Sequence, residues 1–193
     1  MRTQDIADII ELFAPLSYQE EWDNSGFQVG DTMAEVTGVL LCTDVTEEVV
    51  SEAIELGYNM VVSHHPLLFH GVKKLLGRNH VERIVSAALR AGVTIYSGHT
   101  SVDNAPGGVS FVMARKLGMT DVSVLDGRTL SDGVCVGSGL LGRLSVSSGR
   151  ELLSRLRDAF AVRVIRYSGP VDVPLERVAL CGGAGGFLRD AAL

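Results

Sequence analysis

Two adjacent histidines, His64 and His65, follow an apolar run and could act as metal ligands. The run occupies residues 60–63, and its β-branched residues favour a buried strand. Pro66 comes next; proline lacks a backbone donor and biases the preceding residue toward an extended or turn conformation. We therefore expect both imidazoles at the carboxyl end of a strand, where ligands bind in open α/β sheets.

The pair His64 and His65 has two interpretations. Adjacent residues on a regular strand point to opposite faces, so they could not share one metal ion there. Where the strand breaks into a loop, this restriction disappears and each imidazole could face a different ion of a pair. The alternative is one packed histidine and one exposed histidine, without any metal.

A second cluster, His99 and Asp103, follows another β-type run at residues 93–97. If both runs belong to one parallel sheet, their ends bring three imidazoles and a carboxylate together. Such ligands suit zinc, iron, manganese or cobalt better than calcium or magnesium, which prefer oxygen ligands. Asp103 could instead start a turn with residues 104–107.

Strand-like and helix-like patterns alternate around these clusters, which predicts βαβ units. Because parallel strands in such units end at one edge of the sheet, the histidines should lie close together. The predicted strands are 36–43, 59–63 and 93–97. The predicted helices are 3–14, one capped by Asp44 or Thr46 and ended by Gly57, one from Asn79 to Gly92, and one closed by Gly118.

The character of the sequence changes from about residue 121. Segments become shorter, glycines interrupt a strand-like run, and no histidine follows. We predict a smaller α/β lobe over 121–174, with a helix near 148–160 and a strand near 161–167. The predicted metal-binding lobe comprises residues 1–120 plus 175–193. Its last strand leads into a loop whose amides could approach a phosphate, with Gly182, Gly183 and Gly185.

Composition excludes several classes of protein. With 46% hydrophobic and 21% charged residues, the 193-residue chain is not disordered. A formal net charge of −6 gives no general footprint for nucleic acid, and the three scattered cysteines form no disulfide framework. No signal peptide opens the chain, and no apolar run approaches the roughly 20 residues that span a membrane. We expect a soluble cytoplasmic protein.

The sequence resembles the dinuclear-metal-centre proteins called GTP cyclohydrolase 1 type 2 homologs, or Nif-three-like proteins. The resemblance implies an α/β fold with two lobes, in which helices flank a mixed or parallel sheet and a metal cleft lies at the strand carboxyl ends. It also implies two divalent transition-metal ions and a toroidal homohexamer. The segments that carry it are 22–31, 63–69, 99–103 with 107–109, and 181–186.

The same resemblance implies roles for individual residues. Asp23 and Asn24 would lie near the metal cleft, where Asp23 could orient a histidine. On the residues alone, a packed Trp22 beside an Asx turn is the favoured interpretation. Contacts to a phosphorylated substrate would come from Lys73, Lys74 and the 182–186 glycine loop. The implied metal ligands are His64, His65, His99 and Asp103.

The activity that the resemblance implies is hydrolytic ring opening of GTP, in which metal-activated water attacks the imidazole-ring carbon of guanine. A different class of function is a ring-forming, metal-binding scaffold or regulator without turnover. Binding of single-stranded nucleic acid is a third possibility, and the acidic balance of the chain disfavours it.

The end of the sequence departs from the family pattern. Family members carry a His-x-x-x-Glu pair beyond the glycine loop, and it completes their two-metal site. No such pair follows residue 103 in this sequence. We expect a piece of a longer chain, because ending after a strand and a loop leaves a parallel sheet unfinished. The alternative is a chain that lacks two ligands and holds its ions loosely.

Overall fold

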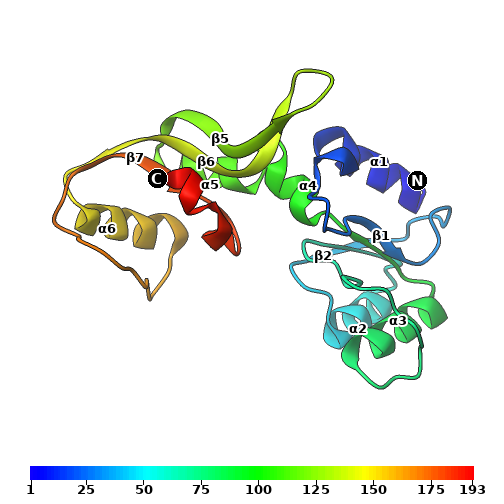
Figure 1. The fold of residues 1–193 in the computed structure, drawn as a ribbon. Coiled ribbons are helices and arrows are strands. Elements are labelled where there is room, and N and C mark those ends of the chain that lie inside the picture. The colour runs from blue at the N-terminus through cyan, green and yellow to red at the C-terminus, as the bar shows by residue number, and fades with distance from the viewer. The chain divides into compact units, whose positions relative to one another are not determined.

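Parallel strands joined by helices form the sheet of the N-terminal part of the molecule (Figure 1). The computed structural model describes residues 1–193 and divides them into two compact units, Met1–Val102 and Asp103–Leu193. The parallel strands of the first unit and their connecting helices are β2 (Val39–Cys42), α2 (Glu47–Glu55), β3 (Met60–Ser63), α3 (His80–Ala91) and β4 (Thr94–Ser97).

Polar caps start the connecting helices at the predicted positions. The Thr46 side chain accepts a hydrogen bond from Val49 N, and the Asn79 side chain accepts one from Glu82 N, at 3.3 Å and 2.9 Å. Gly92 ends α3 in the left-handed conformation, with φ +68°. Asp44, the other predicted cap, has a different role that is described below.

A fourth strand, β1 (Gly26–Val29), pairs antiparallel with β4 and makes the sheet mixed, in the order β1-β4-β3-β2. The sequence pattern did not predict β1, because its apolar part is short and lies between Gly26 and Gly30. Gly30 follows the strand with φ +111°, which only glycine adopts readily.

Helices cover both faces of this sheet. On one face, α2 and α3 pack through Ala53, Ile84 and Ala88 against strand residues such as Val61 and Ile95. On the other face, Ala7 of α1 (Thr3–Phe13) packs against Met60 and Tyr96. The first unit therefore has three layers, with α1 on one side and α2 and α3 on the other (Figure 1).

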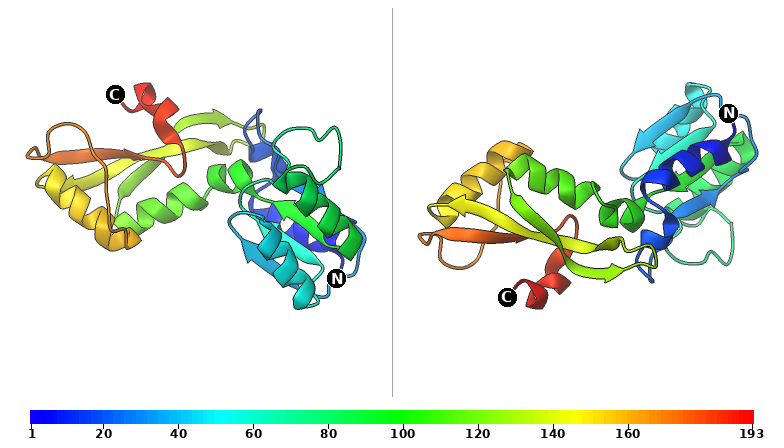
Figure 2. Two further views of the ribbon diagram at one scale, coloured as in Figure 1. Left: turned by 90° about the horizontal axis from the view of Figure 1, so that it is seen from below. Right: turned by 90° about the horizontal axis from the view of Figure 1, so that it is seen from above.

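The second unit is built on an antiparallel sheet in the order β5-β6-β7. Helices α5 and α6 lie on one face of it, and the C-terminal turns lie on the other (Figure 2). On the helical face, Ala114 and Leu117 pack with Leu144 in an apolar core. The elements are β5 (Thr120–Thr129), β6 (Cys135–Val146), α6 (Gly149–Phe160), β7 (Leu175–Leu180) and α5 (Val109–Leu117).

One predicted segment of this unit is confirmed and another is wrong. The helix predicted near 148–160 is confirmed as α6, and Ser148 caps it. The strand predicted near 161–167 is wrong, because this segment has no strand partner and Val164 is 79% exposed. The apolar pattern alone does not make a strand where no neighbouring strand accepts its hydrogen bonds.

The boundary between the units differs from the predicted lobes. Residues 103–120 and 175–193 were assigned to the metal-binding lobe, but they fold with the second unit. The physical reason is pairing and packing: β7 hydrogen-bonds to β6, and α5 shares a core with β6.

The predicted fold class is confirmed: it is α/β, with a mixed sheet that helices flank. None of its helices is both long and apolar enough to cross a membrane.

Candidate functional site

The carboxyl ends of β3 and β4 hold the histidines. Backbone hydrogen bonds continue beyond the strands, since His64 N donates to Cys42 O at 3.1 Å and His99 N donates to His64 O at 2.9 Å. His65 N donates to Thr43 O at 2.9 Å. The sheet therefore fixes the backbone of all three histidines.

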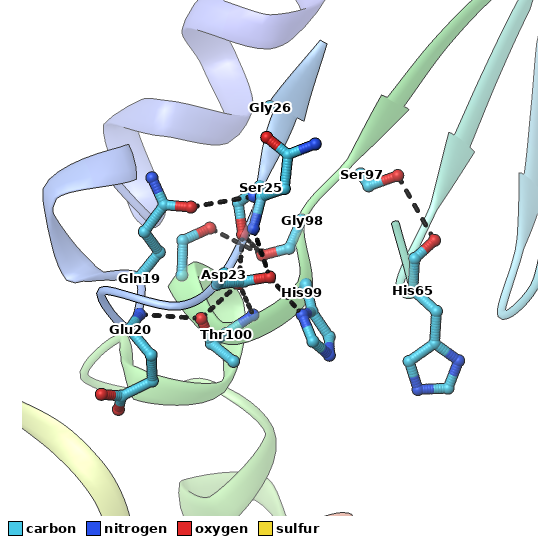
Figure 3. A network of polar contacts seen from close by, with 12 residues as sticks. Gln19, Glu20, Asp23, Ser25, Gly26, His65, Ser97, Gly98, His99 and Thr100 are labelled. Carbon is cyan, nitrogen blue, oxygen red and sulfur yellow. Dashed lines mark hydrogen bonds and ion pairs between the residues drawn. The ribbon is translucent and has the colours of Figure 1, made fainter. Parts of the chain in front are cut away.

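Two buried serines at the strand ends fix the turn at His65. The hydroxyls of Ser63 and Ser97 lie 2.7 Å apart, and both contact the carbonyl oxygen of His65, at 2.9 Å and 3.3 Å. Figure 3 shows the contact from Ser97. Since β3 ends at Ser63, the rule that neighbouring side chains point to opposite faces no longer applies to His64 and His65.

The three imidazoles form a cluster. The ring centroids of His64 and His65 are 4.8 Å apart, and each is 5.6 Å from the ring of His99. His64 is half-buried and His65 is exposed, so the alternative of one packed and one exposed histidine without a metal ion stays open.

Asp23 holds His99 through the imidazole Nδ1, which lies 2.6 Å from Asp23 Oδ1 (Figure 3). The Asp23 side chain is fully shielded from solvent, and that of His99 is 15% exposed. Burial by itself raises the pKa of Asp23, but hydrogen bonds from His99, Thr100, Asn24 and Ser25 outweigh it and hold the pKa well below its usual range.

This ionised carboxylate fixes the tautomer of His99. A carboxylate only accepts hydrogen bonds, so the Nδ1 of His99 carries a proton, and the neutral imidazole then has its lone pair on Nε2. Thr100 strengthens the arrangement, since its N donates to Asp23 at 3.0 Å and its hydroxyl also donates to Asp23. The contact between Asp23 and a histidine that the sequence analysis anticipated is present.

Asp44 plays the matching part for His65, and the sequence analysis did not predict it. Its Oδ1 lies 2.7 Å from His65 Nδ1, on a more open surface where the Asp44 and His65 side chains are 66% and 48% exposed. Asp44 was interpreted as a helix cap, but Thr46 takes that position. The missed signal was its place just beyond the carboxyl end of β2, at the edge where β3 delivers His65.

The histidine cluster suits a transition-metal ion in ligand chemistry and in spacing. Two imidazoles on one tetrahedral ion, with metal–nitrogen bonds of about 2.0–2.1 Å, have ring centres about 5 Å apart. The observed spacings of 4.8 to 5.6 Å match this value. As placed in the structure, no group of three or more His, Cys, Asp or Glu side chains could hold a metal ion.

Asp103 lies in α4 (His99–Asn104), one helical turn after His99, and is the first residue of the second unit. A spacing of four residues favours the same side of a helix. The structure thus brings together the three histidines, while Asp103 stays a predicted ligand.

Other predicted residues surround or lie apart from the cluster. Asn24 Nδ2 donates to Leu68 O at 2.6 Å and so ties its loop to the segment after the histidines. Lys73 and Lys74 are exposed in the loop before α3. Trp22 is 59% exposed, so the packed tryptophan favoured on the residues alone is wrong.

The glycine loop 182–186 belongs to the second unit and leads into a short 3-10 turn, Gly185–Leu188, rather than an α-helix. Gly185 lies so close to Cys181 that a Cβ added at position 185 would be only 2.7 Å from the Cys181 Cβ. Close packing thus accounts for this glycine, and a phosphate-binding role for Gly182 and Gly183 stays a prediction.

Comparison with known sequences gives matches over the whole chain. The family model Duf34/NIF3 (NGG1p interacting factor 3) matches residues 1–193. A Lactococcus lactis protein named GTP cyclohydrolase 1 type 2 homolog is 34% identical over 196 residues, which cover 100% of this chain and 74% of that protein. A Clostridium perfringens protein of the same name is 29% identical over 192 residues, covering 99% of this chain and 73% of its own.

Solved structures share the fold. A Bacillus cereus protein related to NIF3 superposes with a TM-score of 0.88 at 21% identity, covering 99% of this chain and 79% of its own. A Staphylococcus aureus protein superposes with a TM-score of 0.84 at 25% identity, covering 100% and 77% of the two chains.

Proposed function

Since this chain belongs to the Duf34/NIF3 family, we propose that it is a metal-dependent hydrolase that opens the ring of GTP or a related nucleotide. The observation that carries the proposal is the cluster of three imidazoles, two of which are held through Nδ1 by carboxylates. This is the arrangement by which proteins orient histidine ligands. The names of the relatives supply the nucleotide as the substrate class.

The proposed cofactor is a pair of divalent transition-metal ions held by His64, His65, His99 and Asp103. When bound, such ions supply Lewis acidity for the activation of water. Asp23 keeps the Nε2 of His99 available as a ligand atom, and Asp44 does the same for His65. Lys73 and Lys74 are the proposed contacts for substrate phosphates in the first unit. The backbone amides of Gly182, Gly183 and Gly185 are proposed as a phosphate contact of the second unit.

Metal analysis combined with a turnover assay tests the proposal. We expect bound zinc, iron, manganese or cobalt and metal-dependent conversion of GTP. His65→Ala should lose both, whereas His80→Ala, which removes an exposed histidine at the start of α3, should keep both. Metal-loaded protein that converts no GTP or related nucleotide would contradict the hydrolase.

A second candidate is a non-catalytic scaffold that assembles into a ring, and several exposed apolar side chains favour it. Ile9 and Leu12 of α1 are 55% and 86% exposed, and Leu41 of β2 is 75% exposed. Exposed apolar groups of this kind are typical of subunit contacts. We expect a homo-oligomer, with a hexamer as the proposed state, and Leu12→Asp should lower the mass measured by light scattering. If the role is purely structural, the protein should form this oligomer and convert no substrate.

A further inference from the structure

Two exposed aromatic rings stand beside His99 without belonging to an apolar core. Trp22 and Phe69 are 59% and 44% exposed, and their ring centroids are 5.9 Å apart. The ring of His99 lies 6.0 Å from Trp22 and 6.3 Å from Phe69. Aromatic side chains commonly line ligand sites, so two accessible rings beside a histidine cluster are placed where a ligand could contact them.

Hydrogen bonds hold the residues next to each of these rings. Trp22 directly precedes Asp23, whose buried carboxylate anchors that loop to His99 and Thr100. Phe69 directly follows Leu68, whose carbonyl oxygen accepts from Asn24 Nδ2 at 2.6 Å and whose N donates to Gln28 Oε1 at 3.1 Å. The backbone that carries each ring is thus held in place without a ligand.

We propose that Trp22 and Phe69 form a stacking platform for the planar heteroaromatic ring of the substrate, a nucleobase, and direct the edge of that ring toward His99. The inference rests on the proposed function, because it uses the same histidine site. The planes of Trp22 and Phe69 meet at 46°, so they do not form a parallel slot. The base stacks on the open face of one ring and meets the other at its edge.

This platform accounts for selectivity that the histidines alone do not provide. Imidazole ligands recognise neither the base nor the sugar of a nucleotide. An aromatic face binds any flat base and gains nothing from a bare phosphate chain. Asn24 thereby acts as a positioning residue for Phe69, since it holds the preceding carbonyl.

Trp22 is the only tryptophan of the chain, so its emission reports directly on the platform. The full chain, loaded with Zn²⁺, is titrated with guanosine, GTP or inorganic triphosphate. We expect guanosine and GTP to quench Trp22 saturably, while inorganic triphosphate leaves the emission unchanged. Free tryptophan amide, titrated in parallel, corrects for absorption by the base.

Phe69→Leu keeps the reporter and removes half of the platform. We expect guanosine to bind about tenfold more weakly, as for loss of one base–aromatic contact. Tyr167→Leu, which removes another exposed aromatic ring, is the matched control and should bind as the wild type does. By calorimetry, Trp22→Leu should weaken binding similarly, and Trp22→Phe should restore most of it.

The inference is overturned if neither guanosine nor GTP quenches Trp22, or if Phe69→Leu and Trp22→Leu bind guanosine as tightly as the wild type. Turnover is measured separately. If guanosine binds at Trp22 but GTP is not converted, the proposed hydrolase activity is wrong and the stacking platform is supported. If both leucine variants convert GTP at the wild-type rate and KM, the stacking platform is wrong and the hydrolase activity is supported. Emission that changes with protein concentration, and not with guanosine, assigns the rings to a subunit contact and overturns the inference.

Discussion

The carboxylate of Asp23 accepts hydrogen bonds from four neighbours, namely His99, Thr100, Asn24 and Ser25. A fully shielded carboxylate is stable only when its oxygens are satisfied in this way. The same bonds that stabilise the loop also set the orientation of His99. Local stability and the proposed metal site therefore depend on one side chain.

We predict that Asp23→Ala lowers the affinity for Co²⁺ by about 10- to 100-fold, as loss of a carboxylate that orients a histidine ligand typically does. Open-shell Co²⁺ near His99 should quench Trp22, whose ring lies 6.0 Å from that imidazole, so emission gives the affinity. Circular dichroism of the variant checks that the fold is kept.

Asp44→Ala is the comparison for this prediction. Its effect should be smaller, because Asp44 and His65 are 66% and 48% exposed and water can replace the lost acceptor. If the wild type and Asp23→Ala bound Co²⁺ with equal affinity, Asp23 would have no role in the metal site.

Sequence reasoning found the histidines but only part of what holds them. A strand that ends in His-His-Pro places its imidazoles at a sheet edge, which follows from local pattern and βαβ topology. Asp44 and Thr100 were missed because their partners lie far away along the chain. A short acidic or hydroxyl side chain after a strand fits a helix cap equally well.

At the scale of elements, strong periodicity and caps predicted α2, α3, α5 and α6. Apolar runs predicted β2, β3 and β4, but they did not predict β1, and the strand predicted near 161–167 is absent. β1 exists because β4 offers it an edge, and segment 161–167 stays irregular because no strand does so. Strand formation depends on a partner that the local sequence does not reveal.

Gly30, which follows β1, has two reasons to be glycine. Its φ is +111°, and a Cβ there would lie 2.5 Å from the Cα of Thr94. We predict that Gly30→Ala destabilises the first unit by about 2–4 kcal/mol, from backbone strain together with the clash. Denaturant unfolding measures the change.

The matched variant for Gly30→Ala is Gly57→Ala. Gly57 also has a positive φ, +70°, but no neighbouring atom lies within 4 Å of the added Cβ. Gly57→Ala should lower the free energy of unfolding by only about 1–2 kcal/mol, which is the penalty of the left-handed conformation. Equal costs at the two glycines would show that β1 does not press against β4 in solution.

The start of α6 is sensitive to acid through Glu151. Hydrogen bonds from Ser147, and then from Arg155, lower the pKa of Glu151 to about 2 from its ordinary 4.5. Because the folded pKa lies below the unfolded pKa, the contribution to stability is fully present above pH 4.5 and is lost as the pH falls through about 2.

We predict that Glu151→Gln flattens this part of the pH profile of thermal unfolding. The variant and the wild type should converge at the acidic end, and the wild type should be more stable at neutral pH. The effect is small, because the group is exposed and water screens it. A constant difference between the two proteins at every pH would rule out an ionised Glu151 as the cause.

At the scale of the whole molecule, the two units have separate apolar cores. The family match spans both units, and the sequence analysis predicted two lobes but placed their limits differently. Composition shifts marked the change of fold near residue 121. They did not show that α5 and β7 bury their apolar residues against β6, which is a property of packing.

Metal binding should therefore stabilise the first unit more than the second, because the first unit supplies three of the four proposed ligands and the second supplies only Asp103. All five histidines of the chain lie in the first unit, and the second unit contains none. A ligand that binds only the folded state raises the free energy of unfolding by RT ln(1 + [L]/Kd), about 2.7 kcal/mol at a hundredfold excess over Kd. We predict that Zn²⁺ raises the unfolding temperature of the first unit by more than that of the second.

Differential scanning calorimetry with Zn²⁺ and with a chelator measures both transitions. The Gly30→Ala variant assigns the two transitions to the two units, because it should lower the unfolding temperature of the first unit alone. His65→Ala should abolish the response to Zn²⁺ and leave the second transition in place, while His80→Ala should respond as the wild type does. If Zn²⁺ instead moved the second transition more than the first, or moved the first one equally in His65→Ala, the metal would bind elsewhere than at the histidine cluster.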